Sequence, residues 1–119
     1  MAHDQVDIDA MLPLLPAAFH ILLALSAGEA HGYGIIHAVE GQTNGALRLS
    51  PGTLYRTIQR LLEDGLIQEP RRLSSPGEDP RRRYYRITPF GLAVVRAETQ
   101  RLTELVRLAK GALRVVESS

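Results

Sequence analysis

The chain has 119 residues, the size of one ordinary domain, with 45% hydrophobic and 23% charged residues, a balance typical of globular proteins. It has no cysteine, which excludes disulfides, thiol catalysis and cysteine-ligated metals. With 14 basic and 13 acidic residues the formal net charge is only +1, which excludes a polybasic tail protein. Because small domains without disulfides often complete their cores by oligomerising, we expect a dimer.

The longest apolar stretch, residues 10–27, is at the lower length limit of a membrane span. Two prolines and a histidine interrupt it, and aspartates instead of basic residues precede it. We therefore predict a buried helix from Pro16 to about Gly28, and a cytoplasmic protein without a membrane segment. Residues 1–12 are predicted to form a mobile or loosely packed N-terminal arm.

Turn signals divide the middle of the chain into further elements. A second helix is predicted over residues 34–40, between glycine-rich turns. Ser50 as N-cap and Pro51 in the first turn predict the start of a third helix. We expect this helix to end at Glu63, because Gly65 can adopt the left-handed conformation that closes a helix.

A hairpin and a long helix complete the predicted order. Extended runs at residues 66–73 and 82–88 flank the turn-rich sequence SSPGEDPR, which predicts two strands and a long exposed loop. Thr88 and Pro89 then open a helix of about 25 residues. Its apolar side chains recur at helical spacing on one face: Val95, Leu102, Leu105, Val106, Ala109, Leu113 and Val116.

This order predicts a mainly α fold with a small β-hairpin, namely a winged helix-turn-helix followed by one long C-terminal helix. We divide the chain into an arm (1–12), a winged helix-turn-helix domain (13–88) and a C-terminal helix (89–119). Charge is distributed unevenly over it. Residues 1–47 carry five acids and no base, residues 48–86 carry nine arginines and five acids, and residues 87–119 carry five bases and three acids. The basic segment contains the third helix and the hairpin, the elements that a winged helix presents to DNA.

The third helix has a polar face that suits a major groove. Its buried face is predicted to consist of Leu54, Ile58, Leu61 and Leu62. Thr53, Arg56, Thr57 and Arg60 are expected on the opposite side, with Tyr55 and Gln59 on a flank. Arginine can bind guanine, glutamine can bind adenine, and threonine can contact a thymine methyl group. The alternative interpretation is an ordinary solvated helix face.

The hairpin returns through six arginines and tyrosines in a row before Ile87, and alternation along the strand places Tyr85 with Ile87 in the core. Arg81 and Arg82, at the loop end, are free to reach phosphates or a narrow minor groove. Alternatively, these arginines pair with Glu69, Glu78 and Asp79. The predicted DNA-contacting residues are Ser50, Thr53, Tyr55, Arg56, Thr57, Gln59, Arg60, Arg81, Arg82, Arg83 and Tyr84.

Three motifs, HGYGII (31–36), LSPGTLYRTIQRLLEDGLI (49–67) and RRRYYRITPFG (81–91), resemble the PadR family of bacterial transcriptional regulators in order and spacing. The resemblance extends from about residue 12 to the end of the chain. The chain is most similar to the short branch of the family, which has a single C-terminal helix. It implies a winged helix-turn-helix that binds operator DNA as a homodimer, usually as a repressor. It also implies recognition by Thr53, Tyr55 and Arg56, and a wing at Arg81 to Tyr84.

In such a dimer the C-terminal helix packs against the partner's N-terminal region. The interface residues that this implies are Leu92, Val95, Leu102, Leu105, Val106, Ala109, Leu113 and Val116. Some short-branch members bind planar drugs between these helices by stacking on tryptophan. This chain has no tryptophan and has Leu102 near that position, which leaves an aliphatic-lined pocket for a small-molecule effector of unidentified chemistry.

The two alternatives to DNA binding are an enzyme and a module for protein–protein contacts. The histidines show neither an HExxH pattern nor another metal-ligand spacing, and the chain lacks a nucleophile elbow and a P-loop, so we expect no enzyme, metal or cofactor. A winged helix that serves only protein–protein contacts is the alternative function. DNA binding through several phosphates would weaken steeply with salt and would distinguish the two.

Overall fold

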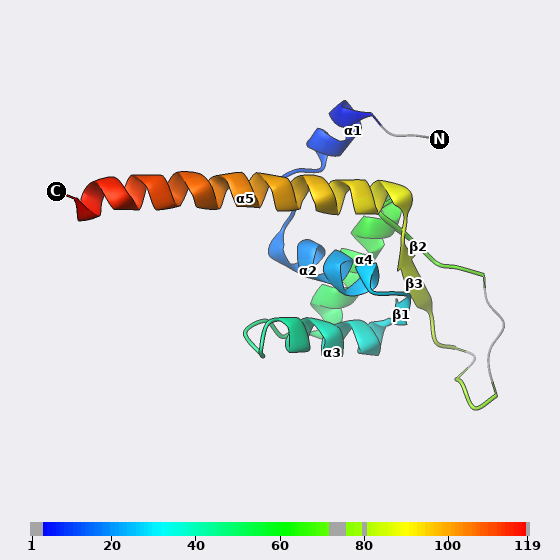
Figure 1. Ribbon diagram of the computed structural model, residues 1–119. Coiled ribbons are helices and arrows are strands. Elements are labelled where there is room, and N and C mark those ends of the chain that lie inside the picture. The colour runs from blue at the N-terminus through cyan, green and yellow to red at the C-terminus, as the bar shows by residue number, and fades with distance from the viewer. Residues whose placement is uncertain (1–3, 72–75, 80, 119) are drawn as a thin grey trace.

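The computed structural model describes residues 4–71, 76–79 and 81–118. Its elements are α1 (Gln5–Ala10), α2 (Pro16–Ser26), β1 (Ala30–His31), α3 (Gly32–Gln42), α4 (Pro51–Glu63), β2 (Ile67–Gln68), β3 (Tyr84–Ile87) and α5 (Pro89–Glu117) (Figure 1). This arrangement of helices around a small antiparallel sheet confirms the predicted fold class. No helix in the described part of the chain is long and apolar enough to cross a membrane.

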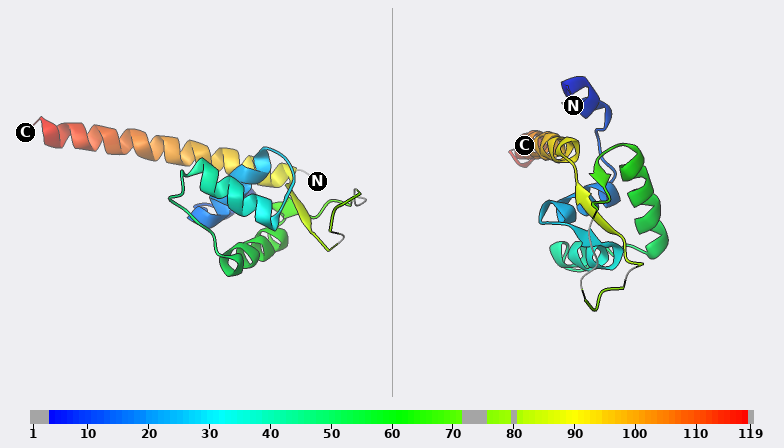
Figure 2. Two further views of the ribbon diagram at one scale, coloured as in Figure 1. Left: turned by 90° about the horizontal axis from the view of Figure 1, so that it is seen from below. Right: turned by 90° about the vertical axis from the view of Figure 1, so that its right-hand side faces the viewer.

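Helix α2 is the centre of the core, as its apolar sequence predicted. Ile21, Leu22 and Leu25 are fully buried, and α2 contacts α3, α4, α5 and β3. Figure 2 shows α5 running along one side of the domain, with α1 on its far side. The elements that the sequence predicted to meet DNA, α4 and the segment around β3, therefore rest on one shared support.

Side-chain caps mark the starts of α4 and α5. The Ser50 hydroxyl accepts a hydrogen bond from the Thr53 N–H at 3.2 Å and so caps α4. Both ends of α4 lie where the sequence predicted. The Thr88 hydroxyl accepts from the Gly91 N–H at 3.0 Å and donates to the Gly65 carbonyl at 2.7 Å. Thr88 thus starts α5 and ties it to the end of α4.

The sheet has three strands in the order β1-β3-β2, and the prediction of a two-stranded hairpin was wrong by one strand. Ala30 pairs with Tyr85 on one side of β3, and Ile67 pairs with Ile87 on the other. A two-residue strand such as β1 carries no alternation by which a sequence could announce it. Both predicted strands are shorter in the structure, and residues 72 and 73 of the first run, like residues 74, 75 and 80 of the predicted loop, lie outside the described part of the chain.

The predicted N-terminal arm contains α1, which contacts α5 through the half-buried Ile8. The chain then crosses α5 to reach α2, and the buried Glu98 fixes this crossing. Glu98 is 1% exposed; its Oε2 accepts from the Leu14 N–H at 2.7 Å, and its Oε1 accepts from Arg101 Nε at 2.5 Å. A buried carboxylate on α5 therefore anchors the segment that joins α1 to α2.

Helix α5 belongs to the domain in its first turns and then leaves it. Phe90, Val94 and Val95 are buried in the core, so Val95, predicted for the dimer interface, faces the domain instead. Leu92 is half-buried. Beyond Arg101 the helix extends past the other elements and gives the molecule its 64 Å long axis (Figure 1).

We predict that Gly91→Ala lowers the free energy of unfolding by about 1–3 kcal/mol. A Cβ at this position would lie 2.7 Å from Ile87 Cγ1 and 3.0 Å from the Leu66 carbonyl carbon, and nearer still to its oxygen, so the backbone at Leu66, just before β2, would have to move. Gly111→Ala is the control in the same helix, because the nearest atom there is 4.0 Å away. Urea unfolding should show it neutral or stabilising; equal losses for both variants would contradict the close packing.

We predict that Glu98→Ala lowers the free energy of unfolding by about 2 kcal/mol, because it leaves the Leu14 N–H without its acceptor. Glu98→Gln keeps an acceptor oxygen and should lose less. The hydrogen bond from Arg101, helped by that from Leu14, lowers the pKa of Glu98 below its ordinary 4.5 against the opposing effect of burial.

The stability that the Glu98 charge contributes is therefore present above pH 4.5 and lost as the pH falls through the lower folded-state pKa. The difference between the wild type and Glu98→Gln in urea unfolding should shrink over that range. A difference that stays constant down to the acid limit of folding would show that the charge has no such role.

Candidate DNA-binding surface

Helix α4 presents a polar face to solvent. Leu54, Ile58 and Leu61 are buried, as predicted, whereas Leu62 is only half-buried. The exposed face consists of Tyr55, Arg56, Gln59 and Arg60, together with the cap residue Ser50. Its long side chains pair along the helix: Gln59 donates to Glu63 at 3.2 Å, and Arg60 to Asp64 at 3.4 Å. Such exposed pairs are weak and leave the side chains able to exchange partners.

Thr53 and Thr57 lie at the edge of the buried face and not opposite it. Both are half-buried, and the Thr57 hydroxyl donates to the Thr53 carbonyl at 2.7 Å. The Thr53 hydroxyl accepts from Ser50 at 3.1 Å and from Arg56 Nη2 at 3.4 Å. With 3.6 residues per turn, Thr57 comes close to Ile58 and Leu54, which corrects the predicted placement.

The wing, defined here as Ile67–Arg71, residues 76–79 and Arg81–Ile87, carries the predicted arginines. Arg81, Arg82 and Arg83 are exposed, whereas Tyr85 is buried, as the strand alternation predicted. The sequence also offered an interpretation in which these arginines pair with nearby acids. The structure bears that out for two of them: Arg81 pairs with Asp79 at 3.2 Å, and Arg83 with Glu69 at 3.6 Å.

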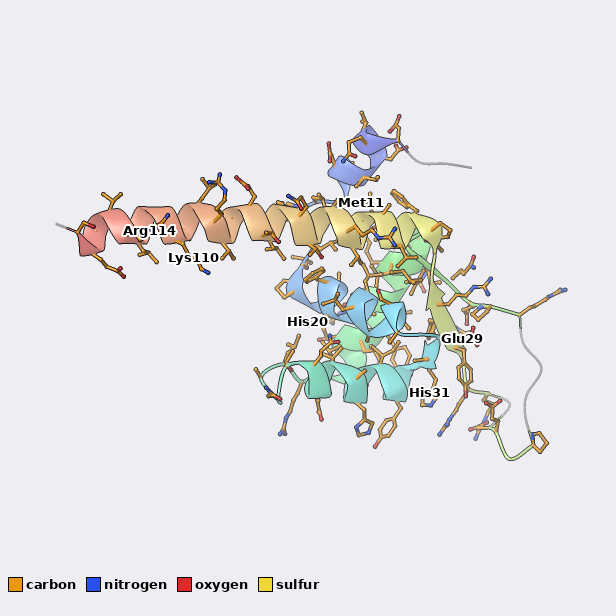
Figure 3. All side chains as sticks on the ribbon, in the orientation of Figure 1. Met11, His20, Glu29, His31, Lys110 and Arg114 are labelled. Atoms are coloured by element: carbon orange, nitrogen blue, oxygen red, sulfur yellow. The ribbon has the colours of Figure 1, made fainter. Side chains whose placement is uncertain are left out.

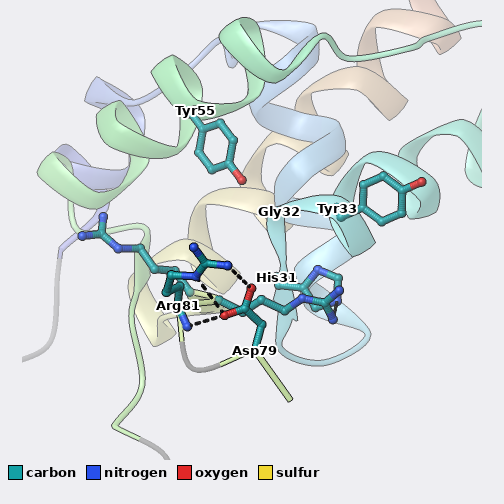
Figure 4. Close-up of a pocket in the computed structure, with 8 residues that line it drawn as sticks. His31, Gly32, Tyr33, Tyr55, Asp79 and Arg81 are labelled. Atoms are coloured by element: carbon teal, nitrogen blue, oxygen red, sulfur yellow. Dashed lines mark hydrogen bonds and ion pairs between the residues drawn. The ribbon is translucent and has the colours of Figure 1, made fainter. Parts of the chain in front are cut away.

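A hollow of about 480 Å³ brings α4 and the wing together with the start of α3 (Figure 4). It is lined by His31, Gly32, Tyr33, Tyr55, Asp79, Arg81, Arg82 and Arg83. The predicted residues Tyr55 and Arg81–Arg83 therefore share one surface. His31 and Tyr33 were not predicted as site residues, although both lie in the HGYGII motif.

His31 joins α3 to the wing through three contacts. Its Nδ1 accepts from the Gly34 N–H at 3.1 Å and so caps α3, while Nε2 lies 3.3 Å from Arg82 Nη1. The edge of one ring meets the face of the other between His31 and Tyr84, with ring centroids 5.4 Å apart. Burial lowers the pKa of His31 below 6.5, and the Arg82 cation lowers it further against the opposing charge of Glu78. The imidazole is therefore neutral at pH 7.

Tyr55 fills the space above Gly32, as Figure 4 shows. A Cβ at Gly32 would lie 2.6 Å from the Tyr55 hydroxyl oxygen and 3.3 Å from Leu54 Cδ2. Only glycine lets the Tyr55 ring lie this close to the start of α3. The ring is still about half exposed, so Tyr55 both spaces the two helices and faces solvent.

A second surface lies on α5. Beyond the domain the helix exposes the following large apolar side chains: Leu105, Val106, Leu108, Leu113, Val115 and Val116. Lys110 and Arg114 lie on the same extended part of the helix (Figure 3). The apolar residues include four of the eight residues predicted for the dimer interface, and no other described element of this chain covers these four.

A capped polar helix packed beside a β-wing, with arginines on both, defines the class of winged-helix DNA-binding regulators. Residues 21–97 match the family described as "Transcriptional regulator PadR-like family". The chain belongs to this family and is a transcriptional regulator, not an enzyme. This confirms the resemblance drawn from the three motifs.

Individual relatives agree with this. The chain is 36% identical over 92 residues to the transcriptional regulator Rv3488 of Mycobacterium tuberculosis, covering 77% of this chain and 80% of that protein. It is 45% identical over 47 residues to the transcriptional regulator YqjI of Escherichia coli, which covers 40% of this chain but 23% of YqjI.

Solved structures share the fold. A PadR-like transcriptional regulator from Bacillus cereus superposes with a TM-score of 0.66 at 24% identity, over 92% of this chain and 97% of that one. Bacillus subtilis PadR in complex with operator DNA gives a TM-score of 0.59 at 19% identity, over 71% of this chain and 47% of that one.

Proposed function

We propose that this regulator binds operator DNA as a homodimer, with α4 in the major groove and the wing against the neighbouring backbone. The observation that carries the proposal is the convergence of Tyr55 of α4 and Arg81–Arg83 of the wing on one exposed surface. Arg56 and Gln59 project from the same face of α4 and can bind guanine and adenine edges. Ser50, Thr53 and Thr57 contribute through the cap and the edge of the helix.

The wing residues are proposed to position the protein and not to read sequence. Arg81, Arg82 and Arg83 are exposed and charged, and they suit phosphate oxygens. Tyr84 is half-buried against His31, so its role is to hold the wing in place beside α3. A bacterial operator lies on the chromosome, and the cytoplasm is therefore the proposed location.

The second copy of the chain is proposed to cover the outer part of α5. Leu105, Val106 and Leu113 are each more than half exposed, and they form one stripe with Leu102, Ala109 and Val116. Apolar patches of this extent on a small domain mark an interaction site. A two-fold dimer would also set the two α4 helices at the spacing of successive major grooves.

The regulator is proposed to act as a repressor that an effector releases. A hollow of about 440 Å³ on α5 is lined by Gln100, Arg101, Glu104, Leu105 and Leu108, and a partner helix could close it into a pocket with polar and aliphatic walls. A ligand there would release DNA only by binding one spacing of the two α4 helices better than the other. Equal affinity of the ligand for the free and the DNA-bound dimer would contradict this mechanism.

We predict that Arg56→Ala weakens operator binding by about 1–3 kcal/mol through loss of a base contact. Operator fragments would first be selected from the source genome with the wild-type protein, and affinity would be measured by fluorescence anisotropy over a salt series. Arg114→Ala on α5 removes the same charge far along the chain and should leave affinity unchanged. Wild-type affinity for Arg56→Ala, or binding that ignores salt, would count against the proposed interface.

We predict that the double variant Leu105→Asp, Leu113→Asp is monomeric in sedimentation, because it places two carboxylates in the proposed seam. Both positions are exposed in the single chain, so the fold should be unaffected. Thr103→Asp, on the flank of the same helix, is the control and should remain dimeric. A dimer that survives the double substitution would place the interface elsewhere.

A further inference from the structure

Acidic side chains already occupy the wing groups that would contact DNA. Asp79 Oδ1 accepts from the Arg81 backbone N–H at 2.9 Å and from Arg81 Nε at 3.2 Å, while Oδ2 lies 3.4 Å from Nη2. Figure 4 shows these contacts at the edge of the hollow. Glu69 forms a single, longer ion pair with Arg83 at 3.6 Å, and Glu78 accepts a hydrogen bond from the Tyr84 hydroxyl at 2.8 Å.

The contact with Asp79 is the one that most resembles a phosphate contact. Both carboxylate oxygens meet the fork of a guanidinium, and this is also how arginine binds a phosphate group. The Arg81 backbone and side-chain hydrogen bonds lower the pKa of Asp79, so its carboxylate is charged at neutral pH. The Arg81 side chain is 90% exposed and that of Asp79 is 41% exposed, so water and incoming phosphates reach the pair.

We infer that Asp79 is an internal competitor of DNA: it holds the Arg81 guanidinium in the free protein and weakens the phosphate contact that Arg81 makes. The inference rests on the proposed contact between the wing and DNA. Because phosphate contacts carry no sequence information, Asp79 sets the affinity for DNA of every sequence, and it keeps non-specific binding low.

The test compares Asp79→Asn with the wild type on a duplex of random sequence and on selected operator fragments. The variant should bind both about three to ten times more tightly per wing. The log–log salt dependence should steepen, by at most about 0.9 for each phosphate that Arg81 newly neutralises. Glu117→Gln is the charge control, because Glu117 is an exposed acid at the end of α5, on another element and outside both hollows; it should change neither quantity.

The gain must depend on Arg81. In an Arg81→Ala background, Asp79→Asn should therefore bind DNA no more tightly than Arg81→Ala alone. A gain that persists in this background would mean a general charge effect and would overturn the inference. Unchanged affinity of Asp79→Asn, or an equal gain for Glu117→Gln, would overturn it as well. Failure of the wild type to bind either DNA would instead refute the proposed function, which separates the two failures.

Discussion

The buried carboxylate of Glu98 is the interaction on which the rest of the architecture depends. It lies on α5, yet it holds the backbone of Leu14 in the segment that leads into α2. Helix α2 in turn supports α3, α4 and β3. Helix α5 also packs on this core through Phe90, Val94 and Val95, so the shared core and the Glu98 hydrogen bond together fix the direction of α4 relative to the axis of α5. The candidate DNA-binding surface of α4 and the wing and the exposed apolar surface of α5 share no residue, yet both are supported by the same core.

The wing carries acids among its arginines, and these acids lower its net positive charge. Its arginines are accompanied by Glu69, Glu78 and Asp79, which bind Arg83, Tyr84 and Arg81 in the free protein. A surface arranged like this has directional donors for phosphates but a weak long-range field. It favours contacts that depend on close fit over indiscriminate attraction to polyanions.

The sequence predicted well the features that local chemistry determines. Helix α4 was placed correctly because Ser50, Pro51 and Gly65 act on their own neighbours. Strand β1 was missed because two residues become a strand only by pairing with β3, which lies more than fifty residues further along the chain. The same limit applies to His31, whose contact Arg82 lies 51 residues away, and to Glu98, whose partner Leu14 lies 84 residues away; neither was predicted. The roles of β1, His31 and Glu98 all depend on contacts between segments that are far apart in the sequence, which local patterns do not reveal.

Helix α5 runs without interruption from the domain core to its outer end, as the 29 residues from Pro89 to Glu117. At 1.5 Å per residue it is a rod of about 43 Å, longer than one turn of B-DNA. No hinge separates its buried turns from its exposed ones. In the proposed dimer each rod would act as a lever arm: a small change in the angle at which two copies cross would swing the attached domains through several ångströms. The length and stiffness of α5, rather than a flexible joint, would then convert the binding of an effector at α5 into a change in the distance between the two α4 helices.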